Sequence, residues 1–147
     1  METSEPITEE QKFRELRKKY RKYPEEAYNF AYEALDFTIK NLTIRAGHVT
    51  ARELLEGYRL YAIDQFGCLA KTVLNNMKIK ETRDVGEIIY QLIEFELMRK
   101  TERDKREDFD NVYNFDEVFN IKPVFSCNPN KKEWKAKYVQ RTKKSNN

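Results

Sequence analysis

Residues 50–98 form the most periodic and most apolar part of this chain, and they constrain its fold most strongly. Three helical patterns follow one another here, separated by Gln-Phe-Gly at 65–67 and by a polar turn at 78–84. Apolar side chains recur at intervals of three and four residues, the spacing that places them on one face of a helix. The segment therefore predicts a helical core, but by itself it indicates no reaction.

Local signals predict the ends of five helices. A capping-box spacing, with Glu or Gln three residues after a threonine, occurs at Thr8 and at Thr50. Gly67 suits the end of a helix, and Thr82 suits the cap of the next long one. The five helices are expected at residues 9–20, 24–41, 51–66, 68–77 and 83–98.

A change of pattern after residue 98 predicts a small β-hairpin. Nine of the ten residues at 99–108 are charged, and aromatic residues then alternate with polar ones. We expect strands at 97–100 and 111–115, forming the wing of a winged-helix-like core. The expected fold class is mainly α with a small β-hairpin (α+β), followed by a basic C-terminal tail. Aromatic side chains expected to close the core from this side are Phe109, Tyr113, Phe115, Phe119 and Phe125.

The charge of +3 over 147 residues is unevenly distributed along the chain. Residues 1–22 carry a net charge of +2, residues 23–121 carry −6, and residues 122–147 carry +7. This layout predicts a basic N-terminal helix at 1–22 packed on one globular domain at 23–121, followed by the basic tail at 122–147.

The fifth predicted helix tests the winged-helix interpretation. A helix that reads duplex DNA needs donors on its outward face and positive charge against the phosphates. Here five carboxylates and one arginine lie between residues 81 and 97, which excludes a sequence-specific duplex reader. The alternative function is a protein-interaction or structural adaptor, in which this helix and the charged hairpin meet a basic partner or a second copy. Its expected outward residues are Asp84, Glu87, Gln91 and Glu94.

The two basic ends of the chain are better candidates for nucleic-acid binding. Lysines surround Trp134 and Tyr138 in the tail, and aromatic rings among basic side chains are typical of single-strand binding. A solvated tail whose tryptophan packs back on the domain is the other interpretation. Our first hypothesis is a small non-enzymatic binding protein associated with RNA or a ribonucleoprotein such as the ribosome. The candidate residues are Lys18, Lys19, Arg21, Lys22, Lys131, Lys132, Trp134, Lys135, Lys137, Tyr138, Arg141, Lys143 and Lys144.

Residue patterns that would carry catalysis or bind a cofactor are lacking. His48 is the only histidine and has no nucleophile motif beside it, so we expect it to order the loop before residue 50. The aspartates at 104–110 lack the central glycine and final glutamate of a calcium loop. No glycine-rich phosphate loop occurs. We therefore expect a non-enzyme without cofactor or metal.

Composition favours a cytoplasmic protein. No apolar run approaches the roughly 18 residues that span a bilayer, and the N-terminal residues do not resemble a signal peptide. Cys68 and Cys127 lie far apart in the sequence, without a neighbouring cysteine, and we expect two reduced thiols.

Several stretches together resemble a known family. These are YPEEAYNFAYEAL, HVTARELLEGYRLYAIDQFG, DVGEIIYQLIEFELMRKTERDKREDF and YNFDEVF, within residues 23–119. They resemble the Minf-type family of conserved hypothetical bacterial proteins, which are about 150 residues long. The resemblance implies the fold and a cytoplasmic setting and supplies no catalytic residues. The tail of this chain is longer and more basic than the family pattern.

Overall fold

The computed structural model describes residues 5–42, 48–99 and 104–141, and it confirms the expected fold class. The chain is mainly helical and has one two-stranded antiparallel sheet. In order, the elements are α1 (Glu9–Lys19), α2 (Glu25–Asn41), α3 (Ala51–Phe66), the 3-10 turn η1 (Gly67–Leu69), α4 (Ala70–Asn76), α5 (Thr82–Glu94), the 3-10 turn η2 (Arg106–Phe109), α6 (Phe115–Val118), β1 (Ile121–Asn128) and β2 (Glu133–Gln140).

Side-chain caps fix the first helices where the sequence predicts them. The Thr8 hydroxyl accepts the backbone N–H of Gln11 at 3.2 Å, and the Gln11 side chain accepts the N–H of Thr8 at 3.0 Å. The Thr50 hydroxyl accepts the N–H of Glu53 at 3.1 Å and so begins α3. Each cap satisfies a backbone donor that the helix itself leaves unpaired. The predicted starts of α1 and α3 are thereby confirmed.

The core forms where α2 and α3 pack closely. Gly57 of α3 lies against Thr38 of α2, and a Cβ at Gly57 would fall 1.8 Å from the Thr38 hydroxyl oxygen. Three buried alanines share this face of α2, as the sequence indicates, so the helices approach without large side chains between them. Beside this contact, the rings of Phe30 and Tyr58 meet edge to face at 4.9 Å between centroids.

Helix α5 carries the second half of the core and ends earlier than predicted. It buries Val85, Ile88, Ile89 and Leu92. The helix ends at Glu94 instead of Met98, because Glu96 adopts a φ of +57° and the N–H of Leu97 donates to the carbonyl of Leu92 at 2.8 Å. Thr82 was predicted to cap this helix, but the cap is Glu81. Thr82 is buried, and its hydroxyl donates to the Phe109 carbonyl at 2.6 Å.

The predicted location of the β-hairpin is wrong. Residues 97–99 and 111–114 contain no strand, and η2 and α6 occupy the region where the wing was expected. Phe109, Phe115 and Phe119 do close the core as expected. The sheet instead lies in the tail at 121–140, and Phe125 on it is exposed rather than buried. The likeness to a winged helix is therefore not confirmed.

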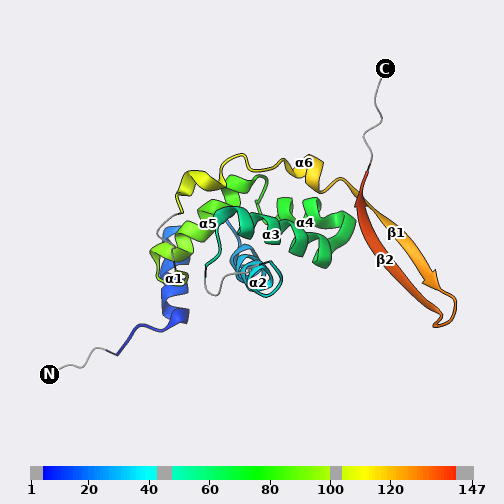
Figure 1. Cartoon of the computed structure of the whole chain (residues 1–147). Coiled ribbons are helices and arrows are strands. Elements are labelled where there is room, and N and C mark those ends of the chain that lie inside the picture. Colours follow the sequence, from blue (N-terminus) through cyan, green and yellow to red (C-terminus); the bar gives the residue numbers. More distant parts are fainter. Residues whose placement is uncertain (1–4, 43–47, 100–103, 142–147) are drawn as a thin grey trace, which may run out of the picture.

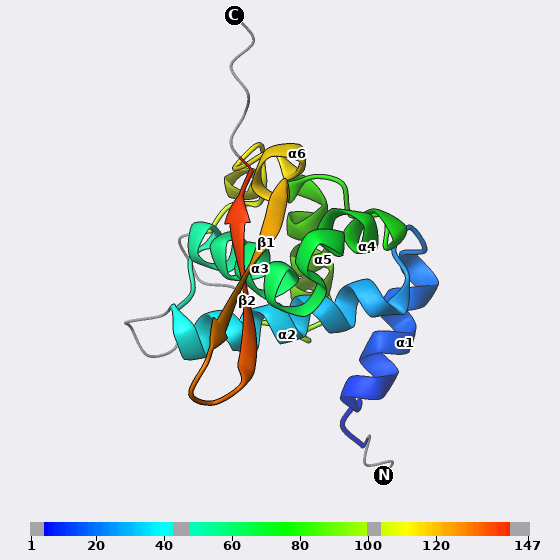
Figure 2. The same ribbon diagram turned by 90° about the vertical axis from the view of Figure 1, so that its right-hand side faces the viewer.

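The helices form one body, and the hairpin projects from it as an arm. In Figure 1, β1 and β2 extend away from the helices at the end of the body opposite α1. Figure 2 looks along this direction and shows the two strands in front of the helical body. Within the described residues, no helix is long and apolar enough to cross a membrane.

Candidate nucleic-acid interface

Residues 121–141, which we call the arm, form an antiparallel hairpin of eight residue pairs from Ile121 opposite Gln140 to Asn128 opposite Glu133. The turn is closed by Asn128, whose side chain accepts the N–H of Asn130 at 3.0 Å. Its carbonyl accepts the N–H of Lys131 at 3.2 Å. Lys132 then adopts a φ of +52° to return the chain into β2. Asparagine side chains commonly stabilise such turns.

The pairing divides the arm into two unlike faces. Opposite residues of an antiparallel pair project to the same side of the sheet, and neighbours along a strand project to opposite sides. The apolar face carries Ile121, Pro123, Phe125, Cys127, Trp134, Ala136, Tyr138 and Gln140. The polar face carries Lys122, Val124, Ser126, Asn128, Glu133, Lys135, Lys137 and Val139.

Most of the apolar face is open to solvent. Phe125 is 65% exposed, Trp134 73% and Tyr138 38%. The alternative interpretation of the tail, in which Trp134 packs back on the domain, is therefore wrong. Soluble proteins seldom leave large aromatic side chains exposed side by side without a binding role. The arm thus has an exposed aromatic surface.

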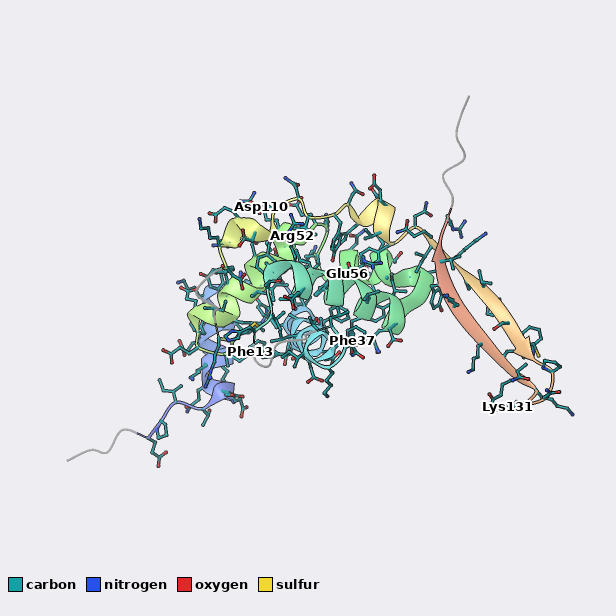
Figure 3. The ribbon with its side chains drawn as sticks, viewed as in Figure 1. Phe13, Phe37, Arg52, Glu56, Asp110 and Lys131 are labelled. Carbon is teal, nitrogen blue, oxygen red and sulfur yellow. The ribbon has the colours of Figure 1, made fainter. Side chains whose placement is uncertain are left out.

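The arm is also the most positively charged element of the chain. Its 21 residues hold six basic side chains and one acidic one, for a net charge of +5. Among the described residues, none of the ion pairs involves an arm lysine. Figure 3 shows Lys131 at the far end of the arm, away from the helices. The arm lysines at 122, 131, 132, 135 and 137 are therefore available to an anionic partner.

A few contacts at its base hold the arm to the body. Ile121 is 4% exposed and is the one arm residue that is fully buried. The backbone N–H of Arg141 donates to the Asn120 carbonyl at 2.9 Å, and its Nε donates to the Ile121 carbonyl at 3.3 Å. Tyr138 packs against Gly67 of η1, so closely that a Cβ at Gly67 would lie 2.5 Å from the tyrosine hydroxyl oxygen. Beyond its base the arm extends away from the helices (Figure 1).

The N-terminal basic cluster differs from the arm, because the body neutralises most of it. Lys18 pairs with Glu15 at 3.2 Å. Lys19 pairs with Glu94 at 2.5 Å, and this bond lowers the pKa of the Glu94 carboxyl. Lys22 lies 3.5 Å from Asp84 and 3.6 Å from Glu87. The two predicted basic sets are not brought together, since α1 and the arm lie at opposite ends of the body (Figure 1). Lys143 and Lys144 lie outside the described residues.

The residues of α5 expected to bind a protein partner all contact side chains from residues 19–28. Asp84 and Gln91 are buried, so the prediction that they face outward is wrong. The Tyr23 hydroxyl lies 2.6 Å from an Asp84 oxygen and 2.8 Å from a Glu87 oxygen. Burial and these carboxylates raise the pKa of Tyr23 far above its ordinary value. Gln91 accepts from Tyr28, and Glu94 from Lys19 and Tyr20. Glu94 remains exposed.

Three further features bear on possible chemistry: His48, the groups that could hold a metal, and one surface hollow. His48 is exposed. Among residues 5–42, 48–99 and 104–141, no group of three or more His, Cys, Asp or Glu is placed to hold a metal. An open hollow of about 450 Å³ lies between α4 and the segment at 111–116, but an ion pair between Lys71 and Asp116 occupies part of its wall.

Comparisons with models of protein families, with curated proteins and with solved structures find no match to this chain. The resemblance to the Minf-type family therefore stays a prediction.

Sequence reasoning found the aromatic and basic residues of β2 but missed those of β1. The sequence analysis places Phe125 in the core, whereas the structure leaves it 65% exposed on β1. The available signal was an alternation of period two at 134–138, where Trp, Ala and Tyr are separated by lysines, after the turn sequence Asn-Pro-Asn. That pattern predicts a strand with one apolar and one basic face.

Proposed function

We propose that this chain is a non-enzymatic RNA-binding protein that contacts RNA, free or within a ribonucleoprotein, through the arm. One observation carries the proposal. The arm combines three exposed aromatic side chains with five lysines that have no described carboxylate partner. Lysines attract the phosphate backbone, and aromatic rings hold bases by stacking. The exposed thiols of Cys68 and Cys127 favour a reducing compartment, which supports a cytoplasmic location.

The pattern of ion pairs favours the arm over the N-terminal basic region as the binding site, because no described ion pair involves an arm lysine. An anionic ligand at the N-terminal cluster would have to compete with Glu15, Glu94, Asp84 and Glu87 for the same ammonium groups. At the arm it would displace only water and counterions. Release of those counterions is the main source of affinity for nucleic acid at low salt.

Fluorescence anisotropy of a labelled single-stranded RNA, titrated with the full chain, tests the proposal. Removing four arm lysines, with Lys131, Lys132, Lys135 and Lys137 each changed to Gln, is expected to weaken binding strongly. The matched control removes four charges from the other candidate region, by changing Lys18, Lys19, Arg21 and Lys22 to Gln. We expect a much smaller effect in the control, with circular dichroism confirming that it folds.

Salt dependence gives a second, quantitative readout. For single strands, the slope of log affinity against log salt is about −0.7 per phosphate neutralised. Five lysines would give a slope of about −3.5, and the arm variant should reduce its magnitude by about 3. If the parent chain binds no RNA at low salt, or if the control loses affinity and the arm variant does not, the proposal is wrong.

A further inference from the structure

The three rings of the apolar face are regularly spaced along the arm. Phe125 lies opposite Ala136, and Ala136 is two residues from Trp134 on one side and from Tyr138 on the other. The rings therefore stand at three successive levels, alternating between the strands. Because a strand rises about 3.3 Å per residue, successive levels are about 6.7 Å apart.

This spacing matches the thickness of nucleotide bases. Stacked bases repeat at about 3.4 Å along a strand. Levels about 6.7 Å apart, with diagonal neighbours on the two strands about 7–8 Å apart, therefore leave room for one base between successive rings. We propose that the arm binds unpaired nucleotides, with one base between Trp134 and Phe125 and the next between Phe125 and Tyr138. This inference rests on the proposed function and names its ligand as a single-stranded segment.

A duplex does not fit this arrangement. Within a double helix both faces of every base are covered by neighbours, so a ring can enter only after the step is unstacked, at a cost in free energy. An unpaired segment offers its base faces freely, and protein aromatics commonly stack on them. The arm should therefore prefer single strands to duplexes of the same sequence.

The lysines are placed to hold the backbone of such a segment. A two-stranded ribbon is only about 5 Å across from strand to strand. Lys135 and Lys137 lie on the polar face, and Lys131 and Lys132 lie at the turn. Their stems are long enough to pass the edges of the ribbon. A single-stranded nucleic acid that lies on the apolar face has its phosphates near those edges.

The charge of the arm also favours a nucleic acid over a second copy of the chain as the partner of the apolar face. Two copies meeting through their apolar faces would bring together two elements of charge +5, and like charges across an interface oppose association. A polyanion with apolar bases complements both properties of the arm at once.

The chain contains one tryptophan, Trp134, so its fluorescence reports directly on this site. The experiment compares three probes of equal length with the full chain: a single-stranded oligoribonucleotide, the same sequence in a duplex, and an abasic ribose-phosphate oligomer. We expect the single strand to quench Trp134 and to bind at least about 10-fold more tightly than the other two, since each stacked base contributes about 5- to 150-fold.

Two neighbouring residues give a matched pair of variants. Phe125→Ala is expected to weaken single-strand binding about 5- to 150-fold, because it removes the central ring. Val124→Ala, which truncates an exposed apolar side chain on the opposite face, should leave binding unchanged. Hydrogen exchange of the strand amides checks that each variant keeps the hairpin.

The outcomes separate this inference from the proposed function. Equal affinity for all three probes without quenching of Trp134 would leave RNA binding intact and overturn base insertion. Absence of binding to every probe would overturn both. A concentration-dependent dimer, or binding to anionic lipid vesicles, that is lost in Phe125→Ala while RNA affinity is unchanged would assign the apolar face to that other partner and overturn the inference.

Discussion

Gly67 of the helical body contacts Tyr138 of the arm, and replacing it tests both the local backbone and this contact. Its φ of +55° and ψ of −131° lie in a region that residues with a side chain rarely adopt. A Cβ there would also lie 2.5 Å from the hydroxyl oxygen of Tyr138 and 2.7 Å from its Cζ. Gly67→Ala therefore introduces backbone strain and a steric overlap.

The expected magnitude follows from these two effects. Strained backbone conformations cost about 1–3 kcal/mol each. The overlap adds less, because Tyr138 is 38% exposed and can move aside. We expect Gly67→Ala to lower the free energy of unfolding by about 2 kcal/mol, equivalent to about 4–8 °C in Tm for a chain of this size. Movement of Tyr138 should also shift the base of the arm and weaken RNA binding.

Urea unfolding followed by circular dichroism measures the first effect. Tyr138→Ala alone should change stability by less than about 1 kcal/mol, since the side chain is half exposed. The double variant removes the overlap but keeps the strain, so it should remain about 1–3 kcal/mol less stable than Tyr138→Ala. If Gly67→Ala unfolds at the same urea concentration as the parent chain, the backbone at residue 67 does not have the described conformation.

Three further predictions concern buried tyrosines. Tyr23→Phe removes a hydroxyl that bonds to the carboxylates of Asp84 and Glu87, and should cost about 2 kcal/mol in urea unfolding. Tyr58→Phe should leave stability unchanged or raise it by up to about 1 kcal/mol, because the Tyr58 hydroxyl is buried without a hydrogen-bond partner in the described part of the chain. Burial raises the pKa of both hydroxyls, so the unfolded state loses these protons above about pH 10 while the folded state keeps them. The free energy of unfolding should then fall as pH rises past 10, by roughly 1.4 kcal/mol per pH unit for each tyrosine. A free energy of unfolding that stays constant above pH 10 would contradict the burial of these hydroxyls.

The sequence predicts the helices of this chain better than its sheet, for a physical reason. Thr8, Thr50 and Gly67 act within one turn of the helix end that they define, so their effect is visible locally. Trp134 and Tyr138 are four residues apart, a spacing that suits one face of a helix and one face of a strand equally. The lysines between them resolve the ambiguity, because they alternate with the apolar residues.

Tertiary contacts explain the remaining differences. Glu96 ends α5 with a positive φ, a position where glycine is the usual signal, so nothing local marks it. Asp84 and Gln91 were expected on an outward face, yet Tyr23 and Tyr28 cover them. Those tyrosines lie more than 60 residues away in sequence. Their approach to α5 follows from the packing of α2 on the body rather than from any pattern within α5.

The single buried residue of the arm, Ile121, has a consequence for how this chain tolerates change. Core substitutions alter the free energy of unfolding, whereas solvent-exposed positions seldom do. Substitutions at positions 122–138 can therefore change aromatic character, charge and size with little effect on the free energy of unfolding. The helical body, by contrast, admits few changes at positions such as Gly57, where no atom can be added. Under the proposed function, recognition and folding are encoded in separate parts of the chain, so recognition can change while the fold stays constant.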